Sequence, residues 1–163
     1  AYKLMSTENI CALPVEQIAH PDALLFLWAT MPMLPDALRV IEAWGFRYVT
    51  NGFTWVKTYP RSGGICIGMG RWTRQNAELC LIAKRGRPTR RDRTVSSVLI
   101  APRGMHSVKP AIIRDNIVRV AGDLPRIELF ARQKTPGWDV WGNELSNDID
   151  LDALAGRRST ATV

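Results

Sequence analysis

Apolar stretches with the periodicity of strands and helices follow one another along this chain. Residues 23–30, with the sequence ALLFLWAT, form an unbroken apolar run, which is typical of a strand buried on both faces. Residues 35–44 instead place apolar side chains at helical spacing. They lie between Pro35, which suits a first helical turn, and Gly45, which suits a helix end. The amino-terminal part therefore predicts a strand followed by a helix.

The next segment predicts a hairpin and then a loop. Residues 46–50 and 53–57 are rich in β-branched and aromatic residues, and the Asn51-Gly52 pair between them is a preferred sequence for a tight β-turn. Residues 59–76 are rich in glycine and show no periodicity, so they predict a long loop. Loops of this length inside a compact domain are usually functional or mobile.

The remaining blocks continue the alternation of strands and helices. Residues 78–84 and 95–101 predict two more strands, residues 110–121 a helix, and residues 127–131 a further strand. Strands that alternate with helices predict an α/β sandwich with a mainly parallel sheet. Residues 146–163 are small and polar, so we expect a weakly ordered tail after the domain.

Composition limits the class of protein. A hydrophobic fraction of 46% in 163 residues is enough for one domain with its own core. The longest apolar run is far shorter than a membrane span, so we expect no membrane partner, with the cytoplasm as the default compartment. Cys11, Cys66 and Cys80 show no C-x-x-C spacing, and only two histidines accompany them. We therefore expect neither a disulfide framework nor a metal site.

Positive charge is concentrated in one segment. The chain has a net charge of +7, and within ten residues only Asp92 offsets a run of cations. These cations are Lys84, Arg85, Arg87, Arg90, Arg91 and Arg93. Most charge runs are simply solvated loops. A field of this strength also attracts phosphate backbones through counterion release, and we place this nucleic-acid interpretation modestly ahead.

Several polar and aromatic residues follow the expected strands. Glu128 lies inside an apolar strand, where a half-buried carboxylate needs partners, and Phe130 follows it. Lys109 precedes the helix at 110–121, while Asn143 and Glu144 come after the apolar residues 140–141. Taken singly, each of these residues is more often structural than functional. Together they indicate a nucleotide-like ligand at the carboxyl edge of a sheet.

One tryptophan has an unusual setting. Trp72 lies in the glycine-rich loop beside Arg71 and Arg74, whereas other tryptophans lie in periodic apolar segments and are expected in the core. An aromatic ring between two cations can stack on a base while the cations contact phosphates. The chain contains no G-x-G-x-x-G motif that follows a strand, no phosphate loop and no G-x-S-x-G motif. We therefore do not expect a serine hydrolase.

Longer motifs carry a resemblance to a known family. The motifs are Y-K-L-M-S (2–6), L-F-L-W-A-T (25–30), A-W-G-F-R-Y-V (43–49), W-V-K-T (55–58), G-M-G-R-W-T-R-Q-N-A-E-L-C-L (68–81), R-G-R-P (85–88), H-S-V-K-P (106–110), I-E-L-F-A-R (127–132) and G-W-D-V-W-G-N-E (137–144). In these stretches the chain resembles the methyltransferase A-seventy family of adenine N6-methyltransferases. That family includes enzymes acting on messenger RNA and on DNA.

The resemblance implies a Rossmann-like fold with a permuted motif order and S-adenosylmethionine as the methyl donor. It implies that Lys109 holds the methionine carboxylate and that Phe130 lines the adenosine pocket. It further implies that Arg132, Asn143 and Glu144 bind the ribose, with Glu128 and Leu129 in the cofactor strand.

The resemblance also implies where the substrate binds. Tyr2, Glu78 and Trp72 would form the pocket for the target base, and the loop at 68–75 would help to admit it. A base within a duplex would have to be flipped out of the stack. The expected nucleic-acid contacts are Arg71, Arg74, Arg87, Arg90, Arg91 and Arg93.

The chain departs from the family in one respect. The family's catalytic motif, Asp-Pro-Pro-Trp or Asp-Pro-Pro-Tyr, normally lies shortly before the position of Tyr2, and it is absent from this sequence. We therefore expect residues 1–145 to form a methyltransferase domain without its first strand and catalytic motif, so that the catalytic residues remain unassigned. The alternative is a catalytically silent family member that binds nucleic acid or a partner subunit.

The sequence says less about the substrate and the oligomeric assembly than about the family. The compact, domain-only length favours DNA over RNA as the substrate. A homodimer and a heterodimer both remain open as assemblies, and the sequence does not choose between them.

Overall fold

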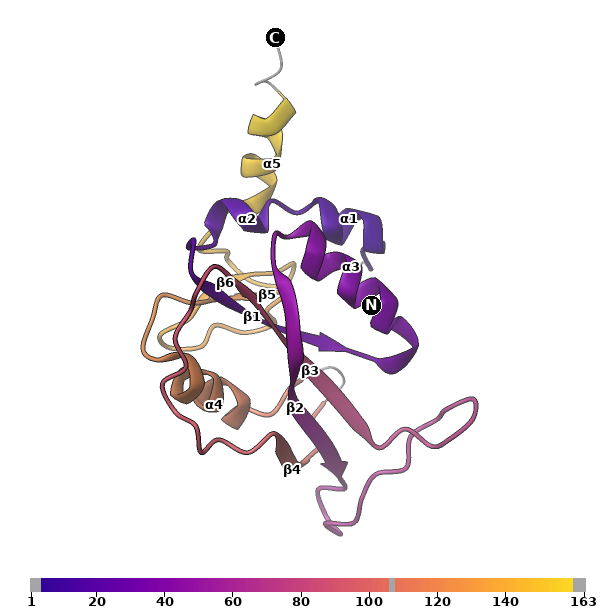
Figure 1. Ribbon diagram of the computed structural model, residues 1–163. Helices are drawn as coiled ribbons and strands as arrows, with labels where there is room; N and C mark the ends of the chain where they lie inside the picture. Colours follow the sequence, from indigo (N-terminus) through magenta and orange to yellow (C-terminus); the bar gives the residue numbers. More distant parts are fainter. Residues whose placement is uncertain (1–3, 106–107, 160–163) are drawn as a thin grey trace.

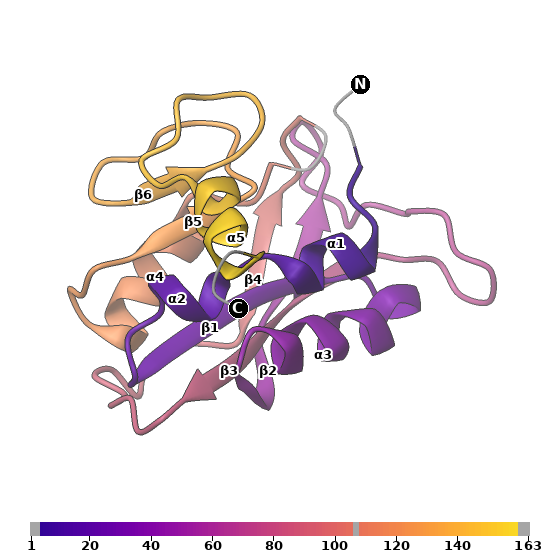
Figure 2. The same cartoon turned by 90° about the horizontal axis from the view of Figure 1, so that it is seen from above.

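A computed structural model describes residues 4–105 and 108–159 of the chain. Tyr2 lies outside these residues. Helices cover both faces of a central sheet, as Figures 1 and 2 show from two directions. The elements are, in order, α1 (Thr7–Ala12), α2 (Val15–Ile18), β1 (Ala23–Ala29), the 3-10 turn η1 (Met31–Met33), α3 (Leu34–Ala43), β2 (Arg47–Thr58), β3 (Ala77–Arg85), β4 (Val98–Pro102), α4 (Ile112–Ala121), β5 (Ile127–Leu129), β6 (Asp139–Trp141) and α5 (Leu151–Ser159).

The strands form two sheets. The larger sheet has the order β1-β3-β2-β4, in which β3 runs antiparallel to both of its neighbours and β2 runs parallel to β4. Three of its strands, β1, β2 and β4, therefore point in one direction. The smaller sheet consists of β5 and β6 in parallel. The predicted α/β class is confirmed, and the larger sheet is mixed.

The expected hairpin at Asn51-Gly52 is wrong. Residues 47–58 form the single long strand β2, with irregular register against β3 on both sides of Thr50 and Asn51. The glycine is needed for packing, because a Cβ atom on Gly52 would lie only 2.5 Å from a side-chain carbon of Ile82. A glycine in a strand often marks such a close approach rather than a turn.

The strand predicted at residues 23–30 is present as β1, but the prediction that both of its faces are buried is wrong. Only Ala29 is buried, and the other six residues of the strand are half-exposed. β1 is an edge strand, since β3 is its one neighbour among the described residues. The strand expected at 127–131 ends at Leu129, because Phe130 adopts a left-handed backbone conformation with φ of 57°.

Two apolar clusters lie on opposite faces of the larger sheet. On one face, Ile41 of α3 and Trp44, the residue that follows this helix, pack with Leu81 of β3 and with residues of α1, α2 and α5. On the other face, Ile113 of α4 packs with Phe53 of β2. Figure 1 shows α4 and α3 on opposite sides of the sheet. The helix expected at 110–121 is confirmed, and Gly122 ends it with φ of 95°.

The carboxyl-terminal residues are more ordered than expected. Leu151, at the start of α5, is fully buried, and Ile149 and Leu154 pack against the same cluster. Asp148 accepts a hydrogen bond from the backbone N–H of Val140 at 3.0 Å. The prediction of a weakly ordered tail is therefore wrong for these residues. Within residues 4–105 and 108–159, no helix is long and apolar enough to cross a bilayer.

Candidate functional site

A cluster of charged residues lies at one edge of the larger sheet. The strand registers bring the carboxyl ends of β1, β2 and β4 and the start of β3 to this edge, which we call the polar edge. Glu78, at the start of β3, bonds through one carboxylate oxygen to Lys57 at the end of β2 and through the other to Lys109. All three side chains are largely buried, with exposed fractions of 28% for Lys57, 19% for Glu78 and 27% for Lys109.

Two tryptophans form the wall of this ion cluster. The Lys109 ammonium lies 5.1 Å from the centre of the Trp28 ring, and the Lys57 ammonium lies 5.2 Å from that of Trp55. The two rings meet edge to face, with centroids 6.4 Å apart, and the Trp55 indole donates a hydrogen bond to the carbonyl of Ala101. Cation–π contacts in such a partly dehydrated place add to the ion pairs. The lysines are therefore held in defined positions.

The ion cluster keeps Glu78 charged. Burial raises the pKa of this carboxyl, but hydrogen bonds and charges from Lys109 and Lys57 outweigh burial and lower the pKa below its ordinary value. The neighbouring Cys80 is fully buried, and burial raises the pKa of its thiol to about 12. Because the thiolate is the reactive form, Cys80 does not act as a nucleophile at neutral pH.

A second group of expected site residues surrounds the end of β5. Phe130 is 42% exposed and meets Trp141 edge to face, with ring centroids 5.3 Å apart. Arg132, Asn143 and Glu144 are all exposed. The structure therefore places these four residues around the ends of the two adjacent strands β5 and β6, as expected for a ligand at strand ends.

The absence of a side chain at Gly142 allows the ends of these two strands to lie close together. A Cβ atom at this position would lie 2.2 Å from the carbonyl oxygen of Ala131, a separation that no side chain tolerates. The close approach allows the N–H of Ala131 to bond to the carbonyl of Trp141 at 3.0 Å. The N–H of Gly142 bonds to the side chain of Asn147 at 2.7 Å.

Glu128 and Leu129 have structural partners. Both oxygens of Glu128 accept hydrogen bonds from Arg114 of α4, at 2.8 and 2.9 Å. This bidentate pair ties β5 to α4, and it supplies the partner that a half-buried carboxylate requires. Leu129 packs against the cluster around Trp44. The two residues position β5, and Arg114 is a contributor that sequence reasoning missed.

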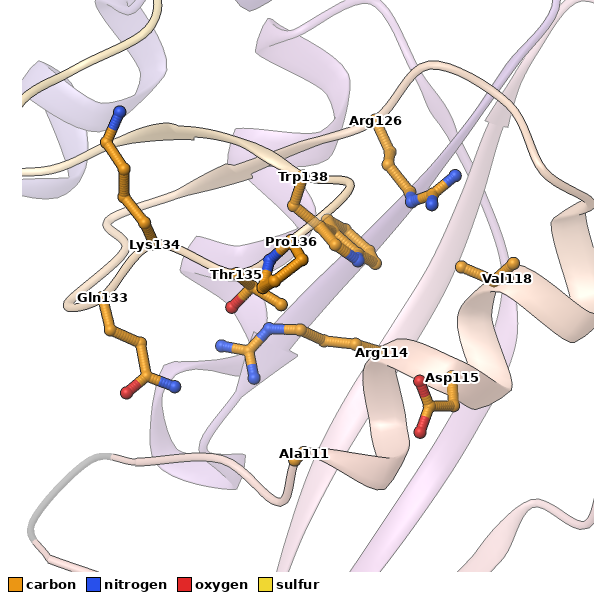
Figure 3. A pocket seen from close by; sticks show the side chains of 10 residues that line it. All are labelled: Ala111, Arg114, Asp115, Val118, Arg126, Gln133, Lys134, Thr135, Pro136 and Trp138. Atoms are coloured by element: carbon orange, nitrogen blue, oxygen red, sulfur yellow. The ribbon is translucent and has the colours of Figure 1, made fainter.

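A pocket of about 490 Å³ lies between α4 and the segment that connects β5 to β6. Figure 3 shows Arg114, Arg126 and Trp138 around it. The Arg126 guanidinium lies 5.5 Å from the centre of the Trp138 ring and also bonds to Asp123. Arg114 is paired with Glu128, and Lys134 is paired with Asp148. The cations around this pocket are therefore already neutralised.

The loop at residues 59–76 extends from the body of the domain in both overall views. At its tip, Trp72 is 99% exposed and Met69 is 89% exposed. Together with Met31 they line a hollow of about 800 Å³. Arg71 and Arg74 are exposed on the same loop. The side chain of Trp72, which was expected to lie between two cations, is therefore not part of the apolar core.

The basic segment is held against α4. Asp92 pairs with Arg119 at 2.7 Å and accepts hydrogen bonds from Thr94, and the backbone N–H of Arg91 bonds to the carbonyl of Val120. These hydrogen bonds lower the pKa of Asp92 to about 2, so the carboxylate stays charged down to strong acid. The four cations of this segment that are expected to contact nucleic acid are all exposed; they are Arg87, Arg90, Arg91 and Arg93.

Sequence reasoning missed Lys57 of the ion cluster and Trp28 of the wall beside it. Lys57 ends an apolar strand pattern, and Trp28 lies in an apolar run, so each has the local signal of an ordinary strand residue. The strand registers bring both residues close to Glu78, and Lys109 reaches the same edge from the segment before α4. The one sequence signal for the site was Lys57 itself, a lysine at the end of a mostly apolar strand pattern.

The fold and this polar edge define an α/β protein with a candidate ligand site at its strand ends. The family model of MT-A70 matches residues 1–144, and the chain belongs to the MT-A70 family.

Individual relatives agree with the family match. The chain is 36% identical over 153 residues to the type II methyltransferase M.MunI of a Mycoplasma species, covering 92% of this chain and 63% of that protein. It is 32% identical over 148 residues to an N(6)-adenosine-methyltransferase MT-A70-like protein of Drosophila melanogaster, covering 88% of this chain and 24% of the relative. It is 30% identical over 146 residues to the N6-methyladenosine RNA methyltransferase MTA1 of Cryphonectria parasitica, covering 85% of this chain and 42% of that protein. The chain thus spans less than two thirds of each of these relatives.

Proposed function

We propose that this chain forms the cofactor-binding and base-binding part of an S-adenosylmethionine-dependent methyltransferase that modifies the N6 amino group of adenine in nucleic acid. The observation that carries the proposal is the ion cluster of Glu78 and Lys109, which joins two family motifs distant in sequence at the polar edge. The proposed fold is Rossmann-like, with a mainly parallel sheet and a permuted order of motifs.

The residues around β5 fit the adenosine part of S-adenosylmethionine. Phe130 presents an exposed ring, and its left-handed backbone turns the chain sharply after β5. Arg132, Asn143 and Glu144 offer exposed donors and acceptors for the ribose hydroxyls. When bound, S-adenosylmethionine supplies an electrophilic methyl group on a positively charged sulfur.

Lys109 fits the methionine carboxylate. Its ammonium has three N–H donors, one of which is directed to Glu78. Because the side chain is partly exposed, a second donor can meet a carboxylate of the ligand. Glu78 and Trp28 hold the ammonium in place before the ligand arrives, which reduces the entropy lost on binding.

The target adenine is proposed to bind beside Glu78, with Trp72 and Tyr2 as further contacts. The amino group of adenine is a poor nucleophile, since its lone pair is delocalised into the ring. Position and exclusion of water therefore have to supply most of the rate. The walls formed by Trp28 and Trp55 are suited to exclude water from the polar edge.

The nucleic-acid backbone is proposed to follow the exposed cations of two segments. Arg71 and Arg74 flank Trp72, and Arg87, Arg90, Arg91 and Arg93 form the second group. DNA is proposed ahead of RNA. The relative at 36% identity is a type II methyltransferase, whereas the relative named as an RNA methyltransferase is 30% identical.

A methyl-transfer assay tests the proposal. The protein is incubated with S-adenosylmethionine and with matched unmethylated DNA or RNA, and released nucleosides are analysed by mass spectrometry. N6-methyladenine in one pool establishes the activity and selects the substrate.

The same assay distinguishes the proposed methyltransferase from the alternative, a catalytically silent binding module. Absence of product in both pools, with S-adenosylmethionine binding intact by calorimetry, supports that module, because the 163 residues contain no Asp-Pro-Pro-Trp motif. Absence of both product and binding refutes the cofactor site.

A further inference from the structure

Two groups of exposed arginines lie at opposite ends of β3. The loop group precedes the strand and the segment group follows it. In Figure 1 the loop before β3 extends at the lower right, whereas the chain leaves β3 toward the upper left. The nine residues of β3, at about 3.4 Å per residue, span roughly 25–30 Å. The loop group consists of Arg71 and Arg74, and the segment group consists of Arg87, Arg90, Arg91 and Arg93.

The loop group lies beside the polar edge. The loop before β3 turns back on itself, because the N–H of Gly68 bonds to the carbonyl of Gln75 at 2.9 Å. A Cβ atom on Gly70 would lie 1.9 Å from the carbonyl oxygen of Thr73, so this turn requires a glycine. The turn leaves the side chain of Trp72 99% exposed. It therefore presents the loop group to solvent at the end of the sheet where β3 begins.

The segment group lies on a fixed backbone away from the polar edge. The N–H of Arg87 bonds to the carboxylate of Asp22 at 2.7 Å, beside the start of β1 and so at the opposite end of the sheet. The N–H of Arg91 bonds to the carbonyl of Val120 at 2.8 Å, near the end of α4. The ten residues of α4, at about 1.5 Å per residue, place this end roughly 15 Å from the start of the helix, which follows Lys109. A backbone fixed in this way loses little further entropy when its side chains meet a ligand.

The acidic residue within the segment does not cancel its positive charge. Asp92 pairs with Arg119 of α4 at 2.7 Å, and the Arg119 side chain remains 52% exposed. Arginine stays protonated in proteins, so the exposed side chains of the segment group present four positive charges to solvent. Cations of this kind attract phosphates without sequence preference.

We propose that one continuous duplex of nucleic acid contacts the loop group and the segment group at the same time. This inference rests on the proposed function, which makes nucleic acid the substrate. The lengths of α4 and β3 separate the groups by about 15–30 Å, so at about 3.4 Å per base pair a duplex reaches both only when it exceeds about five to nine base pairs. The target adenine, at the polar edge, lies beside the loop group and therefore near one end of the contacted stretch.

A single duplex suits this spacing better than two separate ligands. Double-stranded DNA has a persistence length of about 150 base pairs and is stiff over such a distance, so contact with one group directs the duplex past the other. The second contact then forms within the same complex, and two linked contacts bind more tightly than either alone. The segment group thus anchors the substrate at a distance and touches no reacting atom.

Duplex length tests this two-point attachment without a methyl-transfer step. The probes are hairpin-closed DNA duplexes of mixed sequence, from about four to about fifteen base pairs, which bracket the calculated span. Fluorescence anisotropy measures their affinity. We expect the affinity to rise by about tenfold or more once the duplex exceeds the span, because a second set of phosphates is then neutralised. Still longer duplexes should add only the small gain from extra binding positions.

Matched variants assign the rise to the two groups. A chain with Arg90→Gln, Arg91→Gln and Arg93→Gln should lose the rise, while its affinity for the shortest duplex falls no more than about twofold, since the loop group still binds that duplex. A chain with Arg71→Gln and Arg74→Gln should lose the same rise. A chain with Arg90→Lys, Arg91→Lys and Arg93→Lys should retain it, because lysine keeps the positive charge.

Three results would overturn the two-point attachment. A wild-type affinity that does not depend on length would show that no second contact forms. A glutamine variant of the segment group that is weakened equally on short and long duplexes would place its contacts next to those of the loop group. Two short duplexes bound to one chain in native mass spectrometry, with no gain on long duplexes, would assign the segment group to a separate site.

The outcome for the attachment is separate from the outcome for the activity, because the titration requires neither S-adenosylmethionine nor catalysis. A rise with duplex length in a chain that forms no N6-methyladenine establishes the attachment and supports the silent binding module. N6-methyladenine without such a rise establishes the methyltransferase and refutes the attachment.

Discussion

The ammonium group of Lys109 lies over the face of the Trp28 ring, 5.1 Å from its centre. Lys109 comes from the segment before α4, whereas Trp28 lies near the end of β1, so the contact joins distant parts of the chain. Glu78 holds the same ammonium from a third element. Three separate segments therefore determine the position of one cation, and such support is what a preorganised binding group requires.

Replacing Lys109 tests the cofactor site. We expect Lys109→Ala to weaken S-adenosylmethionine binding by about tenfold or more, because a charge-assisted hydrogen bond contributes roughly 1.5–3 kcal/mol. Lys84→Ala, which removes a lysine from the start of the cation run, should leave the affinity unchanged. Isothermal titration calorimetry on both variants measures the difference. Equal affinities would show that Lys109 does not contact the ligand.

The ion cluster predicts a pH-dependent stability. The pKa of Glu78 is lowered in the folded protein, so its charged form stabilises the fold above the ordinary value of 4.5, and this contribution is lost as the pH falls through the lowered pKa. We expect Glu78→Gln to cost about 1–3 kcal/mol at pH 7 and progressively less in acid. Urea unfolding over this pH range measures it.

The exposed Glu42 of α3 provides the matched control for this series. Glu42→Gln should change the free energy of unfolding little at any pH. A difference between the wild type and Glu78→Gln that stayed constant down to strong acid would contradict the assigned role of the charge.

The basic segment predicts a salt dependence. Changing Arg90, Arg91 and Arg93 to glutamine should weaken nucleic-acid binding and flatten its dependence on salt. On a duplex, the log–log slope should become shallower by about 0.9 for each phosphate that the variant no longer neutralises. Fluorescence anisotropy at several salt concentrations measures the slope. Arg39→Gln and Arg47→Gln on other elements are the controls. An unchanged slope in the triple variant would mean that the segment faces away from the substrate.

The close packing at Gly142 predicts a loss of stability. Gly142→Ala would press a methyl group against the carbonyl of Ala131, and overpacking of this kind costs about 1–3 kcal/mol. Gly156→Ala in α5 meets no neighbour within 4 Å and should instead stabilise the protein by roughly 0.5–1 kcal/mol. Thermal unfolding compares the two. A Gly142→Ala variant as stable as the wild type would show that β5 and β6 separate easily.

Most of the elements were predictable because their signals are local. The helix α3 has its proline and its apolar spacing within its own residues, and α4 has its terminating glycine. The prediction of a hairpin at Asn51-Gly52 was wrong because the reason for this glycine is not local. The glycine is required by the side chain of Ile82, which lies on another strand, and no local pattern reveals such a contact.

The candidate site also combines features with local sequence signals and contacts between distant segments. The α/β class followed from periodicity and the family from contiguous motifs, because both are local properties of the chain, whereas the roles of Lys109, Glu78 and Phe130 are predictions that the family resemblance implies. Two relationships needed the folded protein: Glu78 bonds to both Lys57 and Lys109, and Arg114 forms its ion pair with Glu128. They depend on strand register and layer packing between segments far apart in the chain, and the energies that select them come from contacts that no single stretch of sequence contains.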